Sequence, residues 1–318
     1  MRYLKSILFI VGLSAIVIVA ANCTKENGPA KTAKELLTLD LTTGINADSL
    51  KSLVSWFQDM GTRFALSDTR KSVALKIKNR FIGWGYTDTK LDSFLVSKPW
   101  RSATYTLYEY NVIATLEGSL YPDSVSIVGG HYDNILTTGD PFTITPGAND
   151  NASGISAAME IARVVKNKNW VPEGTIKFIA FGSEELGLCG SQAYASKALQ
   201  NNEKIKMMLN SDMIAYEPSG DKSAWIMNIL DYDNSHDLRI LAQVMCTKYS
   251  VLKYTNINTY NKQSDSYPFS TNGYKALFFF SNVMDPNYHT LNDLVTNCNF
   301  EYCSEIVKVA CALLVDKN

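Results

Sequence analysis

The sequence predicts an α/β fold built around a largely parallel central sheet. Short apolar runs typical of strands alternate with segments of helical periodicity, which is the pattern of strands connected by crossover helices. The run at 175–181 is apolar at nearly every position, as expected of a strand covered on both faces. No linker-like break follows residue 45, so residues 46–318 are expected to form one domain.

The predicted elements follow one another along this domain. Asn46 or Asp48 caps a first helix that runs to Phe57 with apolar residues at helical spacing. A second helix covers residues 67–83 and ends near two glycines. Apolar runs then predict strands, and amphipathic segments predict helices. The strands are 108–116, 124–128, 175–181, 207–209 and 276–280, and the helices are 152–165, 191–199, 236–249 and 301–315.

Composition excludes several classes of protein. The 318 residues are 46% hydrophobic and 19% charged, which excludes a disordered or fibrous chain. The 30 basic and 31 acidic side chains nearly cancel, and no basic stripe is visible, so nucleic acid is not an expected partner. Only three histidines occur, His131, His236 and His289, and we interpret His236 as an ordinary surface or capping residue.

The first residues predict an export signal. Arg2 and Lys5 precede an apolar stretch over 7–21 that is too short to span a bilayer comfortably. Cys23 follows, as in bacterial lipoprotein signals, whose cysteine carries the lipid; an ordinary export signal is the alternative. We expect a signal peptide over 1–22, a tether over 23–45 and a lipid anchor to the membrane through Cys23. The protein would then be an exported cell-envelope lipoprotein, on the periplasmic or surface side.

Five cysteines follow Cys23, and an oxidising envelope permits disulfides between them. A pair between Cys298 and Cys303 is possible, but the sequence alone leaves the pairing open.

Side chains that can bind metals follow the predicted strands. They are His131 and Asp133 after 124–128, Glu184 and Glu185 after 175–181, Asp212 after 207–209, His289 after 276–280, and Asp150 just before the helix at 152. The carboxyl ends of parallel strands meet at one edge of a sheet, where ligands bind. Each residue alone is explained by a turn, a cap or the surface. Together, the carboxylates would repel unless a cation lay between them, which favours divalent ions with nitrogen and oxygen ligands.

These stretches resemble the zinc-dependent exopeptidase family typified by bacterial leucyl aminopeptidase, with glutamate carboxypeptidase and glutaminyl cyclase as more distant relatives. The resemblance covers roughly residues 46–318, in the family's order. The matching stretches are NVIATLEG (111–118), GHYD (130–133), GANDNASG (147–154), FGSEELG (181–187), LNSDMI (209–214), SD (264–265) and YHTLND (288–293).

The resemblance implies a three-layer α/β/α domain whose mixed, mainly parallel sheet holds two zinc ions. Asp150 and a water or hydroxide would bridge the ions, one of which would also bind His131 and Asp212 and the other Glu185 and His289. Glu184 would be the general base, Asp133 would orient His131, and the Asp150–Asn151 peptide bond would be cis. Tyr288 would hydrogen-bond the reaction intermediate, although simple packing is an equal alternative.

The function implied is an exported di-zinc aminopeptidase that hydrolyses the N-terminal peptide bond of peptides through a metal-bound hydroxide. A single-zinc glutaminyl cyclase that forms pyroglutamate is the alternative, followed by a carboxypeptidase and by a binding domain without catalysis. Ser266 stands where many relatives have histidine, in a segment near their substrate pocket. Aromatic residues around it suggest an apolar or aromatic first substrate residue, unless they are structural: Tyr254, Tyr260, Tyr267, Phe269 and Tyr274. The oligomeric state is not predicted.

Overall fold

The computed structural model describes residues 30–318, and residues 33–318 form one compact unit. The predicted signal peptide and Cys23 lie outside the described residues. Within them, no helix combines the length and the apolar character needed to cross a bilayer.

The helices are α1 (Ala33–Thr43), α2 (Ala47–Gln58), α3 (Arg70–Gly83), α4 (Gly154–Asn167), α5 (Cys189–Gln200), α6 (His236–Tyr249), α7 (Ser266–Thr271) and α8 (Phe300–Lys317). The strands are β1 (Thr89–Trp100), β2 (Ala103–Leu116), β3 (Tyr121–His131), β4 (Gly174–Phe181), β5 (Lys204–Ser211), β6 (Ile226–Leu230), β7 (Lys253–Thr255) and β8 (Ala276–Ser281).

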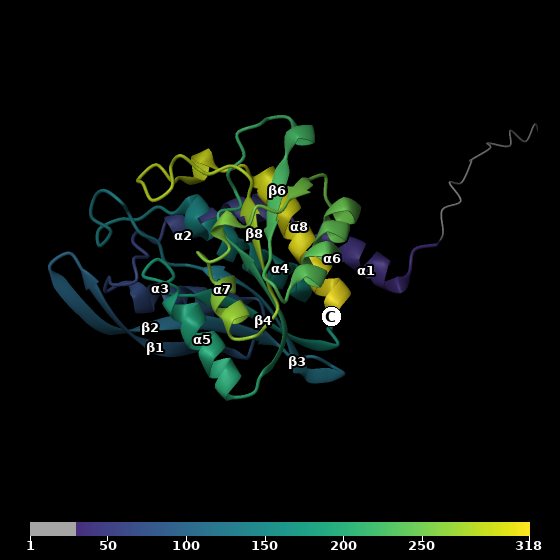
Figure 1. The fold of residues 1–318 in the computed structure, drawn as a ribbon, viewed down its shortest axis with the longest axis horizontal. Coiled ribbons are helices and arrows are strands. Elements are labelled where there is room, and N and C mark those ends of the chain that lie inside the picture. Colours follow the sequence, from purple (N-terminus) through teal and green to yellow (C-terminus); the bar gives the residue numbers. More distant parts are fainter. Residues whose placement is uncertain (1–29) are drawn as a thin grey trace, which may run out of the picture. The chain divides into compact units, whose positions relative to one another are not determined.

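The strands form one mixed sheet in the order β1-β2-β4-β3-β5-β8-β6-β7 (Figure 1). The four central strands β4, β3, β5 and β8 are parallel, so their carboxyl ends share one edge. The antiparallel hairpin β1–β2 extends the sheet on one side, and β6 runs antiparallel to β8 on the other. The prediction of a mixed, mainly parallel sheet is confirmed.

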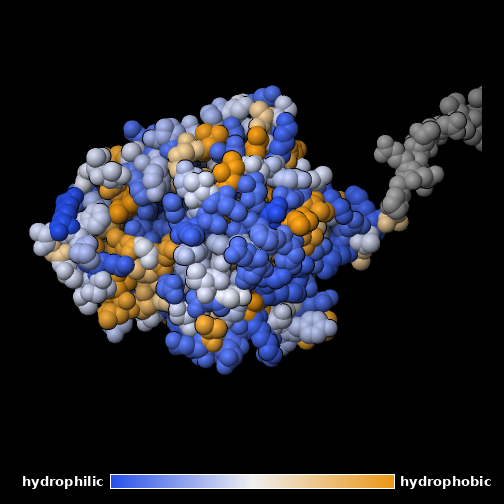
Figure 2. Space-filling model, viewed as in Figure 1, coloured by the Kyte–Doolittle hydropathy of each residue, from blue (hydrophilic) through white to orange (hydrophobic). Residues whose placement is uncertain are grey.

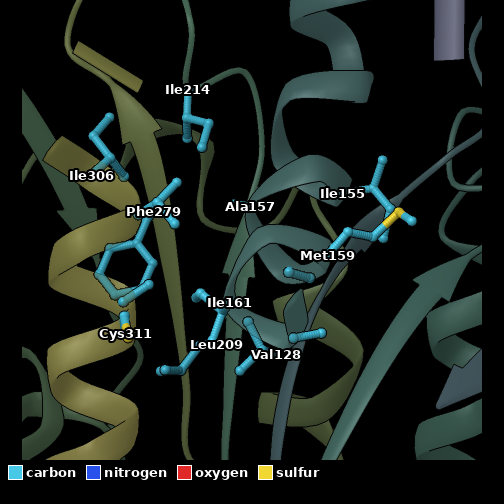
Figure 3. Close-up of a cluster of buried hydrophobic side chains, with 14 of the residues drawn as sticks. Val128, Ile155, Ala157, Met159, Ile161, Leu209, Ile214, Phe279, Ile306 and Cys311 are labelled. Atoms are coloured by element: carbon cyan, nitrogen blue, oxygen red, sulfur yellow. The ribbon is translucent and has the colours of Figure 1, made fainter. Parts of the chain in front are cut away.

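Helices cover both faces of this sheet. Side chains of α2, α3, α4 and α8 bury one face, and those of α5 and α7 bury the other. Figure 3 shows Val128, Leu209 and Phe279 of three neighbouring strands in the cluster that they form with Ile161 of α4 and Cys311 of α8. Successive side chains of a strand point to opposite faces of the sheet, so Ile127 and Val128 of β3 lie in different core clusters. The three-layer α/β/α arrangement is therefore present.

All predicted helices and strands are present, with ends that differ by a few residues. Asn46 resolves the first cap, because its side chain accepts the N–H groups of Asp48 and Ser49. The sequence analysis missed β1, β6, β7 and α7. Hairpin β1–β2 exposes Leu95 and Tyr108, and Figure 2 shows an apolar patch on the side of the molecule where this hairpin lies.

The predicted tether needs correction at its end. Residues 33–43 form helix α1, which packs against α8 with Thr38, Leu41 and Thr42 buried. The physical reason is that Leu41 joins the main core, so this segment belongs to the domain. The possible Cys298–Cys303 disulfide is also absent, because the five cysteines of the described residues are free thiols.

Candidate metal centre

The predicted ligands meet at the shared carboxyl edge of the central strands. His131 ends β3, Glu184 and Glu185 follow β4, and Asp212 follows β5. The ring of His289, from the β8–α8 loop, reaches the same cluster. A cavity of about 290 Å³ lies at this edge; its walls are His131, Asp150, Glu184, Glu185, Asp212, Met213, Tyr260, Gln263, Phe278, Phe280, Met284 and Tyr288.

Asp150 lies between the two histidines. It sits in the turn over Ala148–Ser153, just before α4, where the backbone is not helical at Asp150 and Asn151, and the peptide bond between these two residues is cis as expected. Its Oδ1 is 3.4 Å from Nε2 of His131, and its Oδ2 is 3.0 Å from Nε2 of His289. The two carboxylate oxygens of one residue thus face two different groups of ligand atoms.

Each group has a third member. On one side Asp212 Oδ2 is 3.5 Å from His131 Nε2, and on the other Glu185 Oε2 is 3.0 Å from His289 Nε2. Within each group the ligand atoms all lie within 4.8 Å of one another. Ligands about 2.0–2.1 Å from a tetrahedral zinc ion are themselves roughly 3.4 Å apart, so the spacing fits zinc.

The charge balance of the cluster also fits divalent cations. Burial raises the pKa of Glu185 to about 7, and the nearby Asp150 carboxylate adds to the rise. Burial likewise raises the pKa of Glu184 well above its usual range, with Glu185 and other carboxylates contributing. One buried oxygen, Oδ1 of Asp212, has no hydrogen-bond partner among the described residues. The protein alone therefore supplies too little positive charge for these carboxylates.

Asp133 orients the site differently from the expectation. His131 Nδ1 is 3.0 Å from the backbone carbonyl oxygen of Asp133 but 3.7 Å from its carboxylate. The carboxylate instead accepts the backbone N–H groups of Glu184 at 2.9 Å and Glu185 at 3.2 Å. Asp133 therefore fixes the His131 ring through its main chain and the Glu184–Glu185 turn through its side chain.

Sequence reasoning missed several residues that hold the ligands. The Asp293 carboxylate accepts hydrogen bonds from the backbone N–H groups of Asn149 and Asp150, which fixes the turn that carries Asp150. Ser264 donates to Asp212 Oδ2 at 2.6 Å and accepts from Asn210. The stretches that contain Asp293 and Ser264 are part of the resemblance, which was the available signal, but their hydrogen bonds join distant segments.

The expected substrate residues divide into two sets. Tyr288 lines the cavity, is 41% exposed and stacks on His289 with ring centroids 3.6 Å apart. Of the aromatic cluster only Tyr260 lines the cavity, whereas Phe269 is buried in the core. Ser266 is also buried, with its hydroxyl 2.8 Å from that of Tyr232, and it does not line the cavity. His236 is a surface residue that pairs with Asp231, outside the cluster.

Comparison with known proteins decides the family. The family described as "Peptidase family M28" matches residues 111–314, which are more than half of the chain. This chain belongs to peptidase family M28. Leucine aminopeptidase 1 of Trichophyton equinum is 28% identical over 224 residues, 68% of this chain and 60% of that protein. The M28 chain thus spans less than two thirds of this relative.

Solved structures share the fold of this M28 chain. The LapA aminopeptidase of Legionella pneumophila has a TM-score of 0.73 at 22% identity, over 98% of this chain and 79% of LapA. BSAP, a zinc aminopeptidase from Bacillus subtilis, has a TM-score of 0.69 at 20% identity, over 86% of this chain and 95% of BSAP. A glutaminyl cyclase from Fimbriiglobus ruber has a TM-score of 0.68 at 17% identity, over 85% of this chain and 95% of the cyclase. At these identities the likeness shows the fold alone.

Proposed function

We propose that this M28 chain is a di-zinc aminopeptidase that removes apolar residues from the N-terminus of peptides. The observation that carries the proposal is Asp150, whose two oxygens face His131 in one three-residue group and His289 in another. A shared carboxylate between two such groups suits a pair of ions, whereas a single-zinc cyclase needs one group. The names of the M28 relatives support the same activity.

The residues would divide the work as follows. His131, Asp150 and Asp212 would hold one zinc ion, and Asp150, Glu185 and His289 the other. When bound, the ions supply Lewis acidity for the scissile carbonyl and lower the pKa of water towards neutrality. Glu184, with its carboxylate 3.9 Å from Nε2 of His131, takes the proton of the attacking water and returns it to the leaving amine.

The cavity wall sets the preference for apolar side chains. Met213, Tyr260, Phe278, Phe280 and Met284 line the cavity beside the ligands. An apolar side chain that leaves water for this wall gains roughly 25 cal/mol for each Å² buried, and a charged side chain would lose its hydration there. Tyr288 lines the same cavity, and we assign its hydroxyl a hydrogen bond to the oxygen of the tetrahedral intermediate.

Metal content and hydrolysis together test this function. We expect two zinc equivalents per chain, and release of leucyl and phenylalanyl anilides that a chelator abolishes and zinc restores. Glu184→Gln should keep both zinc equivalents and lose about 10²–10⁴-fold in kcat. One zinc equivalent with cyclisation of an N-terminal glutamine would assign the cyclase instead. A folded chain that takes up no zinc would refute both enzymes.

We also propose that the protein is exported and anchored by a lipid on Cys23. The support is the order of basic residues, apolar stretch and cysteine at positions 2–23. The full chain expressed in bacteria should partition with membranes and carry labelled fatty acid. Cys23→Ser should lose the label and leave the membrane fraction, and an unlabelled wild-type chain would refute the anchor.

A further inference from the structure

Arg63, between α2 and α3, is a buried arginine whose side-chain hydrogen bonds all go to backbone carbonyl groups. Its Nε donates to Tyr132 at 2.8 Å, and its Nη2 donates to Gly147 at 2.7 Å. Its Nη1 donates to Phe57 and Pro146, both at 3.0 Å. Arg63 is 1% exposed and forms no ion pair with the residues described. A fully buried guanidinium with only neutral partners is unusual and needs an explanation.

The carbonyl groups that Arg63 binds belong to the two loops that carry metal ligands. Tyr132 directly follows His131, and Gly147 lies three residues before Asp150. The backbone at Gly147 has a φ of +49°, and a Cβ atom built there would lie 2.8 Å from Nη2 of Arg63. The guanidinium therefore fills the gap between the loops, and Phe57 at the end of α2 ties it to the rest of the fold.

The charge of Arg63 matches its surroundings. Burial lowers its pKa to about 10, while Asp293, Asp133 and Asp150 oppose the fall, so the side chain stays protonated at neutral pH. It provides a fixed positive charge beside the carboxylate cluster. Its planar fork also spreads donors over several directions, which the compact ammonium of a lysine cannot do.

We propose that Arg63 is a positioning residue that sets the spacing of His131 and Asp150, and through it the zinc affinity of the group His131–Asp150–Asp212. The inference rests on the proposed metal centre. Metal ligands are usually oriented by hydrogen bonds to their side chains, whereas Arg63 would orient them through the backbone of their loops. Residues with that task typically change metal affinity 10–100-fold when they are replaced.

The test uses Arg63→Lys, which keeps the charge, and Arg63→Met, which removes it. Arg163→Met is the matched control, because Arg163 also donates to a backbone carbonyl, that of Gly44, and to buried Glu160, in a different region. We would measure zinc dissociation constants by competition with a chromophoric chelator, the visible absorption of the cobalt(II) protein, and urea unfolding of the metal-free chains.

Arg63→Lys is expected to fold, to bind zinc about 10–100-fold more weakly and to show an altered cobalt spectrum. Saturating zinc should restore most of its kcat, because the ligands and Glu184 are intact. Arg163→Met should lose stability and keep the wild-type zinc affinity and spectrum. If Arg63→Met does not fold, Arg63→Lys decides.

An Arg63→Lys chain that is less stable when metal-free but has wild-type zinc affinity and spectrum would overturn the proposal, since Arg63 would then be structural only. A wild-type chain without zinc or cobalt binding would instead refute the metal centre, so the two failures are distinguishable.

Discussion

Replacing Glu109 with glutamine should stabilise this protein near neutral pH. Glu109 lies on β2, 1% exposed, and burial raises the pKa of its carboxyl to about 8, with the nearby Asp133 carboxylate adding to the rise. The Tyr132 hydroxyl lies 3.0 Å from Glu109 Oε1 and 2.8 Å from the Tyr110 carbonyl oxygen. Tyr132 has one proton for two acceptors, so a protonated Glu109 can donate to Tyr132 while Tyr132 donates to Tyr110.

The sign and size of the effect follow from linkage. The folded chain keeps a proton that an unfolded Glu109, with an ordinary pKa of 4.5, releases, so stability falls as pH rises from about 4.5 to about 8. The loss amounts to about 3 kcal/mol at pH 7 and less than about 1 kcal/mol at pH 5. Glutamine does not titrate, so the variant avoids this loss.

The assay is urea unfolding of metal-free wild type and Glu109→Gln at pH 5 and pH 7. The unfolding free energy of the variant, relative to that of the wild type, should be about 2 kcal/mol higher at pH 7 than at pH 5. Glu117→Gln, at an exposed glutamate just beyond β2, is the control and should change stability by less than about 0.5 kcal/mol at both. Equal differences between Glu109→Gln and wild type at the two pH values would mean that folded Glu109 is ionised, and the reasoning would fail.

Three further predictions concern two residues of the metal centre and one buried carboxylate outside it. Asp150→Ala should lose zinc from both groups, as metal analysis would show; retention of two equivalents would rule out a shared ligand. Asp231 is buried, yet hydrogen bonds from His236, Asn258 and Arg239 hold the pKa of its carboxyl at about 2. The ionised carboxylate therefore contributes to folding stability above about pH 4, and this contribution is lost towards pH 2. Asp231→Asn should therefore lower the unfolding free energy by about 2 kcal/mol at pH 7 and little at pH 2. Tyr288→Phe should keep the stacking on His289 and the zinc, and lower kcat on the order of 10²-fold; unchanged kcat would leave Tyr288 a packing residue.

The ligand set could be predicted from sequence because its signals are local. His131, Glu184 and Asp212 each stand at or just after an apolar strand, and the parallel arrangement of the strands gives the rest. His289 has a weaker local signal: it lies further along the loop that follows strand 276–280, with a φ of +56°, and the family resemblance supported its assignment as a ligand. The core helices were predictable for the same local reason, because their apolar faces repeat at helical spacing.

The missed features depend on contacts between distant segments. Arg63 binds carbonyl groups 69 to 84 residues away, and Asp293 binds N–H groups 143 and 144 residues away. Neither residue type at these positions indicates such a partner. Strand β1 was missed because its side chains alternate weakly: its register with β2 pairs Leu95 with Tyr108, and both are exposed. A hairpin held by backbone pairing and one covered face carries little periodic signal.

These long-range contacts lead to a last prediction about the metal-free protein. Three side chains fix the ligand loops through backbone groups. Asp133 holds the N–H groups of Glu184 and Glu185, and Asp293 holds those of the turn at Asn149 and Asp150. Arg63 holds the carbonyl groups of Tyr132, next to His131, and of Gly147, before Asp150. None of these hydrogen bonds needs a metal ion. The loops should therefore keep their geometry without zinc, unlike small domains that fold only when metal binds.

Chelation should then leave the circular dichroism and the cooperativity of unfolding unchanged. It should lower the unfolding free energy only by linkage, about 4 kcal/mol per site when free zinc exceeds its dissociation constant a thousandfold. Rebinding of zinc should be fast and without a slow folding phase, because the ligand atoms already stand at spacings that suit the ion. A metal-free chain that lost its cooperative transition would show instead that the ions build the site, and that the backbone contacts of Arg63, Asp133 and Asp293 are too weak to hold it.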